Sequence, residues 1–221
     1  ERRGVSPPCD SLFTGRATMP TSLGIDIGGA NIKVADSGEF AESIPFPLWK
    51  HPDALVNQLR RIALQHMHLR RVAVTMTGEL CDCYATKREG VARILEAVDS
   101  AFPTWSVSVF RVDGALVSLE TALSDYLLVA AANWRALADW VGRTLATEDR
   151  ALLIDTGSTT TDVHPILNAN PMPLEYRDDR RPQSSEPVYT GARPTPPRAL
   201  PGHRATAGSF ATTADPYAPP G

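Results

Sequence analysis

Two short segments of this sequence place an Asp two residues before a glycine, each at the end of an apolar run. In the first, Asp26 is followed by Gly28 and Gly29, and in the second, Asp155 is followed by Gly157. An Asp at the end of a buried strand offers a fixed, hard oxygen ligand for Mg²⁺, and glycine lets the next backbone amides approach an anionic phosphate closely. The two segments are therefore candidate phosphate-binding turns.

Further groups that can donate to phosphate oxygens follow both glycine turns. They belong to Asn31, Lys33, Ser158, Thr159 and Thr160. A single Asp-x-Gly hairpin is weak evidence for such a site, but two of them, 129 residues apart, favour it. We expect Asp26 and Asp155 to approach each other across a cleft and to bind one hydrated Mg²⁺ together with a diphosphate-bearing small molecule.

The elements that must position these turns alternate between strand and helix patterns. Strands are predicted from period-two alternation and β-branched residues, and helices from apolar residues three and four apart. The predicted strands are 23–27, 31–36, 71–77, 106–112, 151–156 and 162–167, and the predicted helices are 53–67, 87–98 and 118–145. This order predicts an α/β fold with a mixed sheet.

The composition of the chain changes sharply near Asn170. The last 51 residues hold 11 of the 19 prolines and few large aliphatic side chains, so they bury too little apolar area to offset the entropy of ordering. We expect a disordered extension over 1–21, a first half over 22–150, the start of a second half over 151–170, and a proline-rich, incomplete or irregular tail over 171–221.

Composition excludes several classes of function. The chain is 43% hydrophobic and 21% charged with a net charge of -3, which is typical of a soluble globular protein and disfavours a nucleic-acid partner. No apolar run approaches the roughly 20 residues that a membrane-spanning helix needs, and residues 1–18 lack the apolar centre of a secretory signal. We expect a cytoplasmic protein without a membrane partner, and we leave its oligomeric state open, including a homo-oligomer.

Beyond the two turns, the sequence resembles a known family. The stretches that carry the resemblance are 24–31, 74–90, 132–134 and 155–165. They are similar to hydantoinase A and oxoprolinase-related proteins of the tetrahydromethanopterin-linked one-carbon pathway, within the actin-like, sugar-kinase and Hsp70-like ATPase superfamily. The resemblance implies two ribonuclease-H-like halves that clamp a phosphorylated ligand, of which we expect the second to be incomplete here.

The resemblance also implies a reaction in the biosynthesis of a methanofuran-type cofactor. In that reaction a furylmethyl diphosphate condenses with a phenol, and Mg²⁺ assists the departure of pyrophosphate. A phenol with a pKa of about 10 needs a base before it attacks. Glu79, Asp82 and Asp155 are the candidate catalytic residues, and Lys87 and Arg88 are candidate diphosphate clamps. The alternative for the residues after 78 is the solvated start of a helix.

Other functions stay open from the sequence alone. An ATP-dependent kinase or a hydantoinase/oxoprolinase-type amidohydrolase of the same superfamily would use the same turns, so ATP is left open as a cofactor. A non-catalytic fragment is a further alternative. An aspartic protease is disfavoured, because it needs two Asp-Thr-Gly loops that share a proton, and only 155–157 has that sequence.

Overall fold

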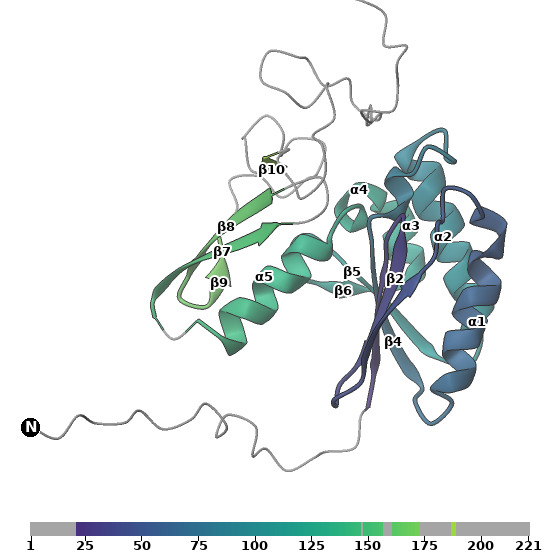
Figure 1. The fold of residues 1–221 in the computed structure, drawn as a ribbon, viewed down its shortest axis with the longest axis horizontal. Coiled ribbons are helices and arrows are strands. Elements are labelled where there is room, and N and C mark those ends of the chain that lie inside the picture. Colours follow the sequence, from purple (N-terminus) through teal and green to yellow (C-terminus); the bar gives the residue numbers. More distant parts are fainter. Residues whose placement is uncertain (1–20, 147, 157–160, 173–186, 189–221) are drawn as a thin grey trace, which may run out of the picture.

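Alternation of apolar and small or polar residues builds a six-stranded sheet in the computed structural model, which describes residues 21–146, 148–156, 161–172 and 187–188. The strand order is β3-β2-β1-β4-β5-β6, with β1 antiparallel to β2 and parallel to β4 (Figure 1). The bounds are β1 Leu23–Ile27, β2 Asn31–Asp36, β3 Ala41–Pro45, β4 Arg71–Met76, β5 Ser106–Phe110 and β6 Leu116–Val117. This mixed sheet confirms the expected α/β, ribonuclease-H-like fold class.

Two amphipathic helices cover one face of this sheet. They are α1, Leu55–Gln65, preceded by the 3₁₀ turn η2, Pro52–Ala54, and α2, Lys87–Ala101, preceded by the 3₁₀ turn η3, Gly78–Leu80. Both helices bury apolar residues at helical spacing against the strands, and full burial of one such side chain contributes about 1.5–3 kcal/mol. The buried set includes Leu55, Leu59, Ile62, Val91, Ile94 and Val98. The hydrophobic core therefore lies between the sheet and these helices.

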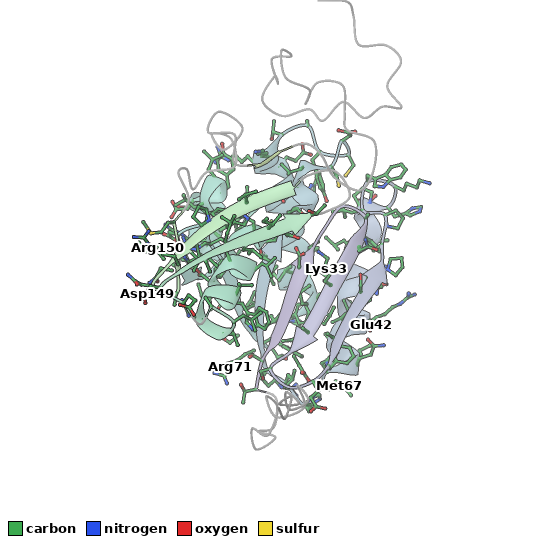
Figure 2. The ribbon with its side chains drawn as sticks, turned by 60° about the vertical axis from the view of Figure 1, so that its left-hand side comes forward. Lys33, Glu42, Met67, Arg71, Asp149 and Arg150 are labelled. Carbon is green, nitrogen blue, oxygen red and sulfur yellow. The ribbon has the colours of Figure 1, made fainter. Side chains whose placement is uncertain are left out.

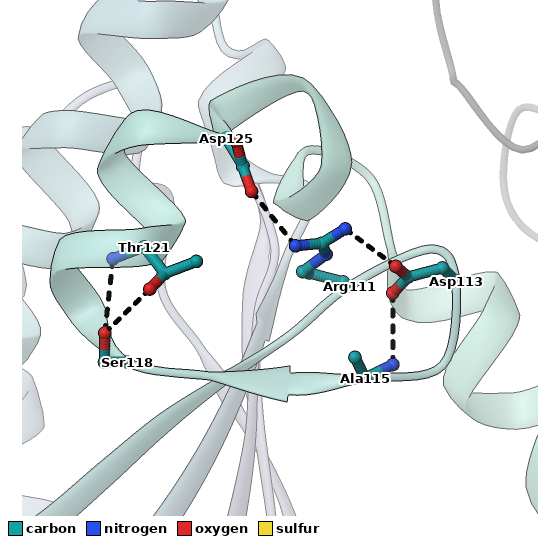
Figure 3. A network of polar contacts seen from close by, with 6 residues as sticks. All are labelled: Arg111, Asp113, Ala115, Ser118, Thr121 and Asp125. Carbon is teal, nitrogen blue, oxygen red and sulfur yellow. Dashed lines mark hydrogen bonds and ion pairs between the residues drawn. The ribbon is translucent and has the colours of Figure 1, made fainter.

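The helix predicted over 118–145 is wrong as one element, because the structure divides it into three. These are α3 Leu119–Ser124, α4 Tyr126–Val129 and α5 Asn133–Thr144. Ser118 caps α3, since its hydroxyl accepts the Thr121 amide at 3.2 Å (Figure 3). At the first break, the Asp125 carboxylate accepts a hydrogen bond from Arg111 at 3.0 Å, and Arg111 also reaches Asp113 at 2.7 Å.

The second break lies at Ala131, whose φ of 48° is incompatible with a continuing right-handed helix. The Ala131 amide donates to the Glu79 carboxylate at 2.8 Å. A typical hydrogen bond contributes about 0.5–1.5 kcal/mol, which offsets part of the strain of this conformation. A residue 52 positions away therefore fixes where α5 begins.

A second, smaller sheet carries the later part of the chain. It contains β7 Arg150–Thr156, β8 Thr161–Leu167, β9 Asn170–Pro171 and β10 Pro187–Val188, in the order β10-β8-β7 with β9 on β8. Trp134 of α5 stacks on His164 of β8 with ring centroids 4.9 Å apart. Helix α5 therefore connects the two sheets, and β7 and β8 lie on the side of the first sheet opposite α1 and α2 (Figure 1).

One strand was not predicted from the sequence, and part of the chain lies outside the described residues. The strand β3 was not predicted, because its residues are largely exposed and show no apolar alternation. Residues 1–20 of the extension proposed over 1–21, and residues 173–186 and 189–221 of the proline-rich tail, lie outside the described residues. Their expected irregularity stays a prediction. Within the described part of the chain, no helix has the length and apolar character needed to cross a bilayer.

Candidate functional site

The first Asp-x-Gly segment forms a tight turn between β1 and β2, as the sequence predicts. The Gly28 amide donates to the Asn31 carbonyl at 3.0 Å, which closes the turn. A Cβ on Gly28 would lie 2.9 Å from that carbonyl oxygen, and one on Gly29 would lie 2.8 Å from the Cys81 sulfur. A backbone contact therefore favours glycine at Gly28, whereas a larger residue at Gly29 would require the Cys81 side chain to move.

Hydrogen bonds to the neighbouring segment orient the peptide units of this turn. The Gly29 carbonyl accepts the Leu48 amide and the Ala30 carbonyl accepts the Phe46 amide, both at 2.9 Å. In a planar trans peptide the carbonyl and the next N–H point in opposite directions. The N–H groups of Ala30 and Asn31 consequently point away from residues 46–48, and consecutive outward amides of this kind form an anion-binding concavity.

Asp26 and Lys33 lie together on the open face of the first sheet. Opposite each other in the β1–β2 register, they form an ion pair at 3.0 Å between Lys33 Nζ and Asp26 Oδ2. The Lys33 side chain is 62% exposed, whereas that of Asp26 is only 18% exposed. Figure 2 shows Lys33 at the surface of the strand that faces β7 and β8. The Lys33 ammonium is therefore accessible to a phosphate oxygen, whereas the Asp26 carboxylate needs another partner when Lys33 leaves it.

A pocket of about 360 Å³ begins beside this ion pair and extends under α5. Its polar lining includes Thr75, which pairs with Asp26 across the parallel β1–β4 register. Asp26 Oδ1 and Thr75 Oγ1 are both buried and have no hydrogen-bond partner among the described residues. Thr75 was not among the residues predicted from the sequence, although it interrupts the small and apolar residues of its strand at the position beside Asp26. The remaining lining is small or apolar, including Gly24, Ala35, Ala73, Phe110 and Ala136.

Glu79, a predicted catalytic residue, lies in η3 beneath the first turn. It is 2% exposed, and its carboxylate accepts the Ala131 amide as described above. The neighbouring glycines enforce this position, since a Cβ on Gly90 would lie 2.7 Å from the Glu79 carbonyl oxygen, and one on Gly78 would lie 2.5 Å from Leu48. The structure thus places Glu79 where it holds the start of α5.

The other residues predicted after β4 lie nearer the surface. Asp82 is exposed, and Lys87 and Arg88 occupy the first turn of α2, whose N-terminus is capped by Thr86. The Arg88 guanidinium lies 5.8 Å from the centre of the Tyr126 ring. The role of Lys87 and Arg88 as diphosphate clamps stays a prediction.

Cys81 and Cys83 flank Asp82 close to the same turn. Both are free thiols, and the Cys83 thiol donates to the Leu48 carbonyl at 3.9 Å. Burial, followed by the charges of Cys83, Glu79 and Asp82, raises the pKa of Cys81 to about 11. Cys81 is therefore a neutral packing group against Gly29 at physiological pH.

Asp155 of the second predicted turn lies in β7, partly buried and opposite Asp162 in the register of β8. Its strand alternates so that Leu152 and Ile154 are 59% and 60% exposed, whereas Asp155 shares the face of Leu153. Gly157, Ser158, Thr159 and Thr160 lie outside the described residues. The expectation that the two turns face one ligand therefore stays a prediction.

The expected Mg²⁺ can be compared with the ligands that these residues offer. Within the described ranges, no three His, Cys, Asp or Glu side chains gather closely enough to hold a metal ion by themselves. Mg²⁺ in proteins commonly keeps several waters and takes one or two carboxylates together with substrate phosphates. Asp26 Oδ1, which has no hydrogen-bond partner in the described chain, fits such a loosely held, hydrated ion.

The family comparison matches more than half of the chain. Residues 70–186 match the model of the hydantoinase/oxoprolinase family. A curated relative from Methanocaldococcus jannaschii, (4-{4-[2-(gamma-L-glutamylamino)ethyl]phenoxymethyl}furan-2-yl)methanamine synthase, is 40% identical over 177 residues, which are 79% of this chain and 52% of the relative. This chain thus spans about half the length of the curated relative that it matches.

Solved structures of Ppx/GppA proteins from Aquifex aeolicus share weaker likeness. A crystal structure of the family member is 14% identical with a TM-score of 0.41, covering 68% of this chain and 48% of that chain. The type II variant of the phosphatase is 13% identical with a TM-score of 0.39, covering 68% and 49%.

Proposed function

The chain belongs to the hydantoinase/oxoprolinase family, and we propose that it is a transferase that joins a furylmethyl diphosphate to a phenol and releases pyrophosphate. The product named for the M. jannaschii relative contains a furan that carries a methanamine group and a phenoxymethyl group. In the proposed step the furylmethyl carbon–oxygen bond to the diphosphate breaks, the phenol oxygen bonds to that carbon, and the phenol proton passes to a base. The 40% identity to that relative supports the assignment.

The single observation that carries this proposal is the outward orientation of the Ala30 and Asn31 amides beside Lys33. Breaking the carbon–oxygen bond places negative charge on the departing diphosphate, and fixed N–H dipoles with an ammonium group stabilise that charge. Bound Mg²⁺ would neutralise part of the same charge, with Asp26 and Asp155 as the carboxylates proposed to hold its water shell. In the second turn, residues 157–160 are proposed to add further donors.

Glu79 and Asp82, the two candidate bases, differ in how accessible they are to a substrate. Glu79 is 2% exposed and bonded to the Ala131 amide, which suits a positioning role for α5. Asp82, three residues after Glu79, is exposed, so a phenol can reach its carboxylate. We therefore propose Asp82 as the base, with Asp155 as the alternative that the sequence also favours.

Binding of pyrophosphate tests the proposed leaving-group site. With Mg²⁺ present, pyrophosphate at 100 times its Kd should stabilise the protein by about 2.7 kcal/mol. Lys33→Met should weaken binding roughly tenfold to a hundredfold, because a hydrogen bond to a charged group contributes about 1.5–3 kcal/mol. Isothermal titration calorimetry on both forms measures this change, and removal of Mg²⁺ with a chelator should also weaken binding.

The matched control is Arg71→Met, which removes one positive charge at the opposite end of the sheet (Figure 2). Screening over that distance should leave its Kd within about twofold of the parent. Equal losses of pyrophosphate affinity in the two variants would show that Lys33 acts only through the net charge of the protein. A clear preference for ATP over pyrophosphate would instead favour the kinase alternative and contradict the proposal.

A further inference from the structure

Two buried side-chain oxygen atoms lie at the floor of the 360 Å³ pocket. Asp26 Oδ1 and Thr75 Oγ1 are buried, have no partner among the described residues, and belong to residues paired on adjacent parallel strands, which lie about 4.8 Å apart. A buried polar atom without a hydrogen bond costs about 1–3 kcal/mol. Two such atoms side by side indicate a ligand group that donates to both.

The chemistry of the two atoms selects the kind of donor. An ionised carboxylate oxygen only accepts, and a threonine hydroxyl can accept as well as donate. A phosphate or carboxylate would be repelled by Asp26, whereas a primary ammonium carries three N–H donors and a charge opposite to that of the carboxylate. The arrangement therefore fits a primary ammonium group.

The rest of the lining fits a flat, apolar body attached to that ammonium. Gly24, Ala35 and Ala73 form a level floor on three neighbouring strands, and Phe110 and Ala136 line its sides. A pocket of this size is at the small end of those that hold ligands, and small floor residues allow a ring to lie close to the sheet. We propose that this pocket binds the furan ring of the substrate and that Asp26 and Thr75 recognise its aminomethyl group.

This inference rests on the proposed function and deepens it by assigning one end of the diphosphate substrate. The incoming ammonium binds Asp26 at Oδ1, whereas Lys33 pairs with Oδ2, and Lys33, which is 62% exposed, turns to the diphosphate. The diphosphate offsets the extra positive charge that the ammonium brings to this face. Because the ammonium then occupies Asp26 Oδ1, the water shell of Mg²⁺ is left to Asp155 and the diphosphate, in place of the Asp26–Asp155 pair proposed above. Thr75, which was not among the residues predicted from the sequence, becomes a specificity-determining residue.

Binding of furan-2-ylmethanamine measures this recognition without any reaction. Titration followed by calorimetry or by NMR of labelled protein should show the amine binding at least tenfold more tightly than the neutral furan-2-ylmethanol. Thr75→Val, which keeps the shape of the side chain, should weaken amine binding roughly tenfold and leave pyrophosphate binding unchanged. Asp26→Asn should remove detectable amine binding.

Two controls separate the alternatives. Ser108→Ala removes a hydroxyl from the residue beside Ala73 on the next strand, outside the pocket lining, and should leave amine binding unchanged. Mg²⁺ alone is the other cation whose water shell could donate to the same atoms. Loss of Mg²⁺ binding in Thr75→Val, or equal binding of amine and alcohol, would overturn the inference. If the protein binds pyrophosphate but not the amine, the inference is overturned and the proposed function stands. If it binds the amine but not pyrophosphate, the proposed function alone is contradicted.

Discussion

Gly90→Ala should destabilise the first sheet and its two helices by about 2 kcal/mol, although alanine usually stabilises a helix interior. Gly90 lies in α2, where helix propensity alone favours alanine by about 1 kcal/mol. The added Cβ would lie 2.7 Å from the carbonyl oxygen and 2.8 Å from the Cα of Glu79. Because both atoms are backbone in a buried turn, the clash can be relieved only by moving α2 away from η3.

The free energy of unfolding from urea titrations checks this prediction. Gly24→Ala is the matched control, because its Cβ would meet only the Ala35 carbonyl oxygen at an ordinary 3.6 Å. The control should keep or slightly raise stability. A Gly90→Ala protein as stable as its parent would show that η3 is not packed against α2 as described, and the placement of Glu79 would then be wrong.

Gly142→Ala should release the second sheet from α5 without unfolding the first sheet. The new Cβ would overlap the carbonyl oxygen of Ala169 and lie 3.0 Å from its carbonyl carbon. Ala169 has a φ of 63° and follows Asn168 at 49°, so the turn between β8 and β9 already has a strained backbone. The contact is lost most easily by moving this turn, together with β7 and β8, off the helix.

Hydrogen exchange measured by mass spectrometry distinguishes this local change from global unfolding. A loss of about 2 kcal/mol should speed exchange in 150–156 and 161–171 roughly thirtyfold, while residues 23–36 keep their protection. Leu137→Ala, at an exposed position of the same helix, should leave both regions unchanged. Faster exchange spread evenly over both sheets would contradict the separate docking of the second sheet.

Much of the fold near the first turn could be predicted because its determinants are local. The β1–β2 hairpin follows from glycines between two alternating runs, and α1 and α2 follow from apolar residues at helical spacing. The expected strands at 151–156 and 162–167 form β7 and β8 for the same reason. Patterns of this kind depend only on neighbouring residues, so they are legible in one sequence.

The features that escaped prediction depend on contacts between distant residues. The break at Ala131 needs a carboxylate 52 residues away, and β3 forms by pairing with β2 although its own residues show no apolar alternation. Thr75 is inconspicuous in its strand until the parallel register places it beside Asp26. Pairing partners and register are global properties, because they are set by the whole sheet.

The central claim, transfer of a furylmethyl group from a diphosphate to a phenol, is tested most directly by following both products at once. The chain is incubated with an aminomethyl-substituted furylmethyl diphosphate, a 4-alkylphenol and Mg²⁺, and the aryl ether and pyrophosphate are quantified by mass spectrometry and an enzymatic assay. We predict one pyrophosphate for each ether formed, a loss of both products in Lys33→Met, and no loss in Arg71→Met. Failure to form the ether under conditions in which the chain binds pyrophosphate would contradict the proposed reaction.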